Sequence, residues 1–71
     1  MNPMATNKPM LSAHEHEVLR LISLGYSSKE VAKIIDRSKR TVDFHLASVY
    51  SKLSVSNRVQ ACNVARDRGI L

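Results

Sequence analysis

An apolar stripe in the second half of the chain is the feature that most limits its fold. Val42, Leu46, Val49 and Leu53 recur at positions i, i+4, i+7 and i+11. At about 100° per residue these positions share one narrow face of a helix, whereas a half-buried strand needs a period of two. The pattern therefore predicts a helix over residues 39 to 53, with one face buried and the opposite face free.

Helix-start signals recur along the chain. Ser12 and Ser27 each stand three residues before a glutamate, which is the spacing of a capping box. Ser38 is a good N-cap for the helix that carries the stripe, and Ser56 or Asn57 can cap a further helix. These signals predict helices over about residues 13 to 24, 28 to 35, 39 to 53 and 57 to 68.

Glycines and a short polar turn divide these helices. Gly25 and Gly69 supply the left-handed residue that ends a helix at little cost, and Asp36 with Arg37 forms a tight turn. After Gly69, the last two residues can fold back on the core. No segment favours a strand, so the predicted fold class is all-α, a four-helix bundle containing a helix-turn-helix.

Length and composition narrow the possible classes of protein. With 71 residues there is room for one small domain, and no apolar run approaches the ~20 residues of a membrane span. No secretory signal is visible, and Cys62 alone cannot close an intramolecular disulfide, so we expect a cytoplasmic protein. Residues 1 to 10 lack periodicity and contain two prolines, which predicts a flexible tail before a domain over residues 11 to 71.

The positive charge is concentrated around the predicted helix-turn-helix. The formal net charge of the chain is +5, and residues 29 to 58 contain seven basic residues against three acidic ones. The first predicted helix, with Glu15, Glu17 and Arg20, is net negative. A basic excess at this place favours contacts with the phosphates of a nucleic acid.

The face opposite the apolar stripe is the candidate for base recognition. It carries Arg40, Phe44, Ala47 and Ser51, with Asp43 and Ser48 on its flanks. A helix in the major groove needs small side chains for close approach and groups that bond base edges or touch thymine methyls, which suits Ala47 and Ser48. Phe44 either packs in the core or touches the groove, and its position favours the groove.

Other polar residues have simpler interpretations. Asp43 either accepts from a cytosine amino group or pairs with Arg40, and we favour the pair. His14 and His16 diverge by about 200° on a helix, so they do not form a metal site together. Cys62 is expected to be a small apolar residue, with a redox-sensitive dimer contact as the alternative. No nucleophile, base and orienting group converge, so we expect neither an enzyme nor a cofactor.

The order and spacing of many residues resemble one known domain. The matching segments are Leu11-Ser12, Glu15-x-Glu17-Val-Leu-Arg-Leu-Ile, Gly25, Ser28-Lys-Glu-Val-Ala, Ser38-x-Arg-Thr-Val, His45-Leu, Tyr50-Ser-Lys-Leu-x-Val-Ser-Asn-Arg and Gln60-Ala. Together they resemble the LuxR/FixJ-type (NarL-type) DNA-binding domain of bacterial transcription regulators over about residues 11 to 71. The chain is similar either to the small stand-alone members of that family or to an excised output domain.

The resemblance implies a non-enzymatic regulator that binds duplex DNA as a homodimer on inverted half-sites, with the third helix in the major groove. It implies base contacts by Asp43, Phe44 and Ala47. The position of Ser48 beside the outward face makes it a fourth candidate for base contact. Residues near phosphates would be Lys29, Lys39, Arg40, Thr41, His45, Lys52 and Arg58. The fourth helix would form the dimer contact, for which the candidates are Ala61, Cys62, Val64 and Ala65. Family members often have Lys or Asn where this chain has Asp43 and Phe44, a departure that bears on the base preference more than on DNA binding.

Two alternatives belong beside this interpretation. A module like sigma-factor region 4 has the same helix-turn-helix but acts with RNA polymerase as its partner. A protein-interaction module of the same fold would use Asp43 and Phe44 to dock a partner, as an antagonist or adaptor.

Overall fold

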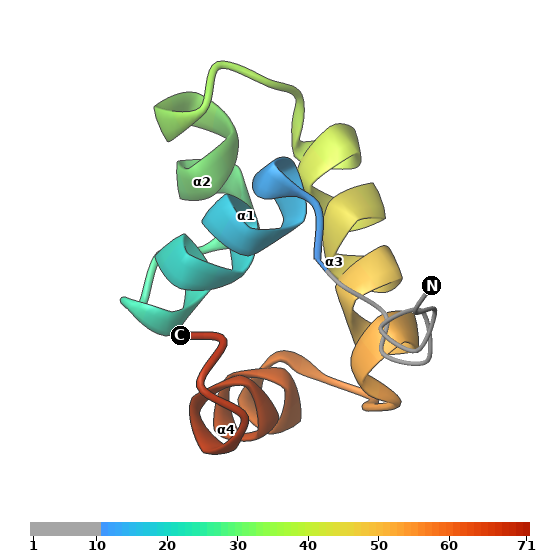
Figure 1. The fold of residues 1–71 in the computed structure, drawn as a ribbon. Helices are drawn as coiled ribbons and strands as arrows, with labels where there is room; N and C mark the ends of the chain where they lie inside the picture. Colours follow the sequence, from blue (N-terminus) through green and yellow to red (C-terminus); the bar gives the residue numbers. More distant parts are fainter. Residues whose placement is uncertain (1–10) are drawn as a thin grey trace.

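A computed structural model of the protein describes residues 11–71, and the predicted tail over residues 1 to 10 lies outside them. Within the described residues the chain forms four α-helices and no strand (Figure 1). The helices are α1 (Ala13–Ser23), α2 (Ser28–Ile34), α3 (Lys39–Leu53) and α4 (Arg58–Asp67). The all-α prediction is confirmed, and every boundary lies within one residue of the predicted position.

Local hydrogen bonds set the start of each helix. The Ser12 hydroxyl accepts from the Glu15 N–H at 3.1 Å, while the Glu15 carboxylate accepts from the Ser12 N–H at 2.8 Å. Ser27 and Glu30 form the same reciprocal pair at the start of α2. Because each cap satisfies backbone donors that the helix leaves unpaired, the helices begin where the sequence places these residues. Ser38 caps α3, and Asn57 rather than Ser56 caps α4.

The connections between helices depend on left-handed residues. Gly25 has φ +101° after α1, a conformation that residues with a Cβ rarely adopt. Asp36 has φ +57° in the turn after α2, where the Arg37 N–H donates to the Ala32 carbonyl at 2.9 Å. Asp tolerates this conformation better than most residues. The short turn joins α2 to α3 and completes the helix-turn-helix.

The core forms around α3. Its apolar stripe, from Val42 to Leu53, is buried as predicted, and α1, α2 and α4 all pack against this helix. In Figure 1, α1 and α2 lie on one side of α3, and α4 passes near its C-terminal end. Ile70 folds back as expected, its N–H donating to the Ala65 carbonyl at 2.8 Å. Of the helices in residues 11–71, none has the length and apolar character needed to cross a membrane.

Candidate nucleic-acid interface

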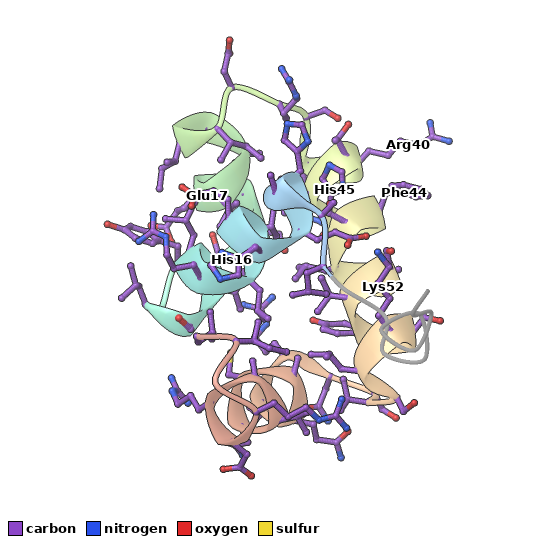
Figure 2. All side chains as sticks on the ribbon, viewed as in Figure 1. His16, Glu17, Arg40, Phe44, His45 and Lys52 are labelled. Atoms are coloured by element: carbon purple, nitrogen blue, oxygen red, sulfur yellow. The ribbon has the colours of Figure 1, made fainter. Side chains whose placement is uncertain are left out.

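The outward face of α3 is free of other helices. Arg40, Phe44, Ala47 and Ser51 are all exposed, and the Phe44 side chain is 70% exposed. Figure 2 shows Arg40 and Phe44 projecting from α3 away from the rest of the domain. Phe44 is therefore not a core residue. Burial of the opposite stripe fixes which side of α3 a partner can reach.

Asp43 is held by a lysine one turn before it. The Lys39 ammonium lies 2.7 Å from Oδ2 of Asp43, and both side chains are about half exposed. This hydrogen bond is the main reason that the pKa of Asp43 lies below its ordinary value. The predicted pairing with Arg40 is wrong, because Lys39 at i−4 makes the contact instead. Asp43 thus neutralises part of the positive charge at the start of α3.

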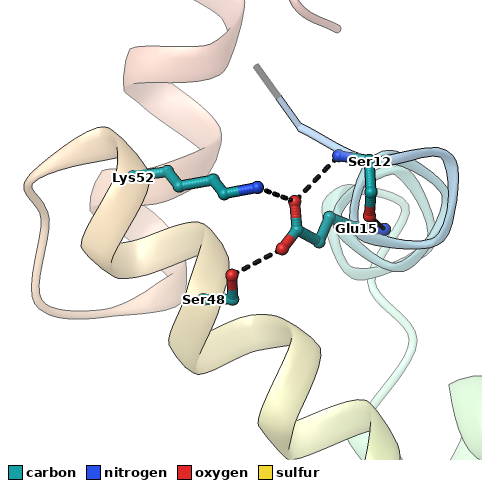
Figure 3. A network of polar contacts seen from close by, with 4 residues as sticks. All are labelled: Ser12, Glu15, Ser48 and Lys52. Atoms are coloured by element: carbon teal, nitrogen blue, oxygen red, sulfur yellow. Dashed lines mark hydrogen bonds and ion pairs between the residues drawn. The ribbon is translucent and has the colours of Figure 1, made fainter. Parts of the chain in front are cut away.

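A buried carboxylate joins α1 to one flank of α3 (Figure 3). Oε2 of Glu15 accepts from the Ser48 hydroxyl at 2.5 Å, and Oε1 lies 2.7 Å from the Lys52 ammonium. Oε1 also accepts from the Ser12 N–H within the capping box. Glu15 is 6% exposed, so its carboxylate is largely shielded from water.

The hydrogen bonds keep the buried carboxylate charged. Burial raises the pKa of Glu15, but the hydrogen bonds from Lys52, Ser48 and Ser12 outweigh that effect and lower the pKa to about 2. The Ser48 hydroxyl is directed at α1, and a base contact by Ser48 stays a prediction. The Lys52 side chain is 32% exposed, and its ammonium forms an ion pair with Glu15.

The same flank of α3 carries an aromatic contact with α1. The ring of His45 stacks on that of His14, with centroids 5.7 Å apart and planes at 10°. The Phe44 ring meets His45 edge-on, with centroids 6.0 Å apart. His16 points elsewhere, with Nε2 2.8 Å from the Ile70 carbonyl. His14 and His16 thus serve different packing contacts.

The remaining phosphate candidates lie at the starts of three helices. Lys29 is exposed in the first turn of α2, and Arg58 is exposed at the start of α4. Thr41 is half-buried, with its hydroxyl 3.0 Å from that of Ser38. The charge of Arg58 also lowers the pKa of Asp43, after larger effects that include the hydrogen bond from Lys39. Arg58 is therefore within electrostatic reach of Asp43.

The structure revises the candidates for a dimer contact on α4. Ala61 and Ala65 are fully buried and Cys62 is almost so, because all three pack into the core of the domain. They are not available to a partner. Val64 is half-buried, whereas Val59, absent from the prediction, is 65% exposed.

The contacts that Glu15 and His14 make with α3 were missed in the sequence analysis. There Glu15 was treated only as a capping residue and His14 only as a metal-ligand candidate. A signal for their contacts was present in α3. His45, Ser48 and Lys52 are spaced at i, i+3 and i+7 along one flank of the apolar stripe. Such a polar line beside a buried face is where a neighbouring helix packs. This line shows which flank of α3 is covered, but it does not show which helix covers that flank.

Comparison with known proteins gives a consistent result. Residues 9–65 match the family described as "Bacterial regulatory proteins, luxR family". A putative HTH-type transcriptional regulator of Mycobacterium bovis, Mb0914c, is 46% identical over 59 residues, which are 83% of this chain and 7% of that protein. The chain thus spans a small part of the length of this curated relative.

Solved structures agree in fold. The transcription factor GerE superposes with a TM-score of 0.83 at 31% identity, covering 90% of this chain and 96% of that one. The VqmA protein of Vibrio cholerae, in a structure with ligand and DNA, superposes with a TM-score of 0.83 at 32% identity. That match covers 93% of this chain and 30% of VqmA.

Proposed function

The chain belongs to the luxR family of bacterial regulatory proteins, a family of transcription regulators and not of enzymes. From that premise we propose that it is a sequence-specific duplex DNA-binding domain that regulates transcription, with α3 inserted in the major groove. The single observation that supports this most is the free face of α3, opposite a fully buried stripe and flanked by basic residues. A free helix face of this kind can approach base edges.

The surface divides into base and phosphate contacts. We place Phe44 and Ala47 over the bases, with Asp43 at the edge of that surface. The phosphate contacts proposed are Lys29, Lys39, Arg40, Thr41 and Arg58. His45 and Lys52 contact α1, so they would support this surface by holding α3 against α1.

Because DNA is the proposed partner, we place the protein in the cytoplasm, on the nucleoid when bound.

A mobility-shift titration tests the DNA contact. A duplex enriched from a random library should bind, and the logarithm of its association constant should fall linearly with the logarithm of salt concentration. Arg40→Ala should weaken binding and reduce that slope by about 1 for each copy bound to the duplex. Arg68→Ala, which removes the same charge from the exposed chain after α4, is the matched control and should leave the slope unchanged. A flat salt dependence for the intact protein would contradict the proposal.

We further propose that two copies bind inverted half-sites through a contact made by α4. Support comes from Val59, exposed on α4 beside a groove that Ile22 and Cys62 help to line. Half-sites centred about 10 bp apart would place both recognition helices on one side of the duplex. Inserting about 5 bp between them should abolish cooperative binding, whereas inserting about 10 bp should restore part of it.

The alternatives give different results in the same titration. A module like sigma-factor region 4 would shift the duplex only when RNA polymerase is added. A protein-interaction module would shift no duplex at any salt concentration. Specific binding by the isolated protein therefore separates the proposed function from both.

A further inference from the structure

We propose that α3 recognises its operator chiefly through the C5-methyl groups of thymine, with Phe44 and Ala47 as the specificity-determining residues. This inference rests on the proposed function and deepens it, because it names the chemical group in DNA that the surface selects. It follows from the side chains that the structure leaves available on α3.

The polar side chains that flank the outward face of α3, Asp43 and Ser48, already form hydrogen bonds within the domain. Asp43 is bonded to Lys39 at 2.7 Å, and the Ser48 hydroxyl donates to the buried Glu15 carboxylate. Each would have to give up an existing contact before it could bond a base edge. The loss would be greatest for Ser48, because the Glu15 carboxylate would remain buried with one fewer donor.

What remains at the centre of the face is apolar. Phe44 and Ala47 are three residues apart, so their side chains are neighbours on the helix surface. Arg40 lies one turn nearer the start of α3, where the positive end of the helix dipole suits a phosphate. In the major groove the C5-methyl of thymine is the apolar group that a base pair presents. An apolar pair at the centre of the face therefore matches thymine better than guanine, which offers two acceptors there.

Contacts with its neighbours orient the Phe44 ring. The ring lies edge-on to His45, and His45 stacks in turn on His14 of α1. An exposed aromatic ring usually loses rotamer freedom when a partner covers it, which opposes binding. The contact with His45 limits that freedom before DNA arrives. His45 is thus a positioning residue for Phe44.

Replacing thymine with deoxyuridine tests this directly, since the exchange removes only the methyl group and keeps every hydrogen-bonding atom. The probe is the duplex enriched by selection, synthesised with thymine or with deoxyuridine at each thymine position in turn. Covering one methyl group corresponds to about fourfold in affinity, from the usual gain per buried carbon. Exchange at one contacted position should therefore weaken binding by the intact protein about fourfold, and exchange at the equivalent positions of both half-sites about sixteenfold.

Variants assign the effect to the protein. Phe44→Ala should bind thymine and uracil duplexes more nearly equally, whereas Phe44→Leu, which keeps an apolar side chain, should retain a preference for thymine. His45→Ala should lower the ratio of thymine to uracil affinity without changing the salt slope. Phe44 is 70% exposed, so its variants should fold, and circular dichroism checks this.

Three results would overturn the inference. Equal affinity of the intact protein for both duplexes would show that methyl groups are not recognised. An unchanged thymine-to-uracil ratio in Phe44→Ala would assign the preference to DNA shape rather than to Phe44. Weaker binding by Phe44→Ala without any thymine preference in the intact protein would make Phe44 a wedge between base steps. Failure of the proposed function itself is distinguishable, because then no duplex would be enriched.

Discussion

Removing the charge of Glu15 should destabilise the domain strongly at neutral pH and progressively less as the pH falls towards 2. Glu15→Gln keeps the size of the side chain and imitates its protonated form. The folded domain lowers the pKa of Glu15 from 4.5 to about 2, which corresponds to about 3 kcal/mol of stability when the group is charged. A domain of this length has roughly 4 to 10 kcal/mol in total. The variant therefore loses a large part of its stability at pH 7.

The pH range follows from the direction of the shift. A carboxyl group whose pKa is lower in the folded state stabilises the fold fully above its unfolded pKa, here about 4.5. That contribution declines as the pH falls towards about 2, and at pH 3 about 1.5 kcal/mol should remain. The difference in unfolding free energy between the intact protein and Glu15→Gln should shrink in the same way.

Urea denaturation followed by circular dichroism between pH 7 and pH 3 measures this difference. Glu17→Gln is a matched control on the same helix, because its pair with Arg20 is about half exposed. Exposed pairs contribute about 0 to 1 kcal/mol, so this control should remain close to the intact protein. The reasoning is refuted if Glu15→Gln loses less than about 1 kcal/mol at pH 7, or if its loss is the same at pH 7 and pH 3.

The other expectations concern DNA binding, assembly and the first turn. Ala47→Glu should abolish binding of the enriched duplex while leaving the circular dichroism spectrum unchanged, because it places charge and bulk on the groove side of α3; retained binding would mean that another face contacts DNA. Val59→Glu should raise the dimer dissociation constant in sedimentation equilibrium, and an unchanged constant would exclude this part of α4. Gly25→Ala should lower the free energy of unfolding by about 1 kcal/mol, since Gly25 has φ +101°; an unchanged urea midpoint would contradict this.

The sequence was sufficient for the helices and for the face of α3. Capping boxes act over three residues, and the apolar stripe acts over one helix, so both are readable without knowing how the helices pack. For the same reason the exposure of Phe44 follows from its place opposite Val42 and Leu46. The turn at Asp36 was also local, since it depends on the four residues, 35 to 38, between α2 and α3.

The buried face of α4 was harder to predict from the sequence, because both sides of that helix carry small or apolar residues. Ala61, Cys62 and Ala65 form its buried side, and Val59 is exposed on the other. A mixed helix offers the same pattern for a core and for a dimer surface. The distinction depends on where α1 and α3 lie.

The contacts made by the flanks of α3 depend on the tertiary structure and could not be predicted from the sequence. Ser48 and Lys52 are 33 and 37 residues from Glu15, and no local rule brings those positions together. Packing of α1 along α3 turns a capping glutamate into a buried, charged partner of both. It also directs the Ser48 hydroxyl at Glu15, and it places His14 against His45. The sequence determined which helices form and which face of α3 is free, because those depend on contacts within a few residues; which polar groups remain free on that face depends on a neighbour that is distant along the chain.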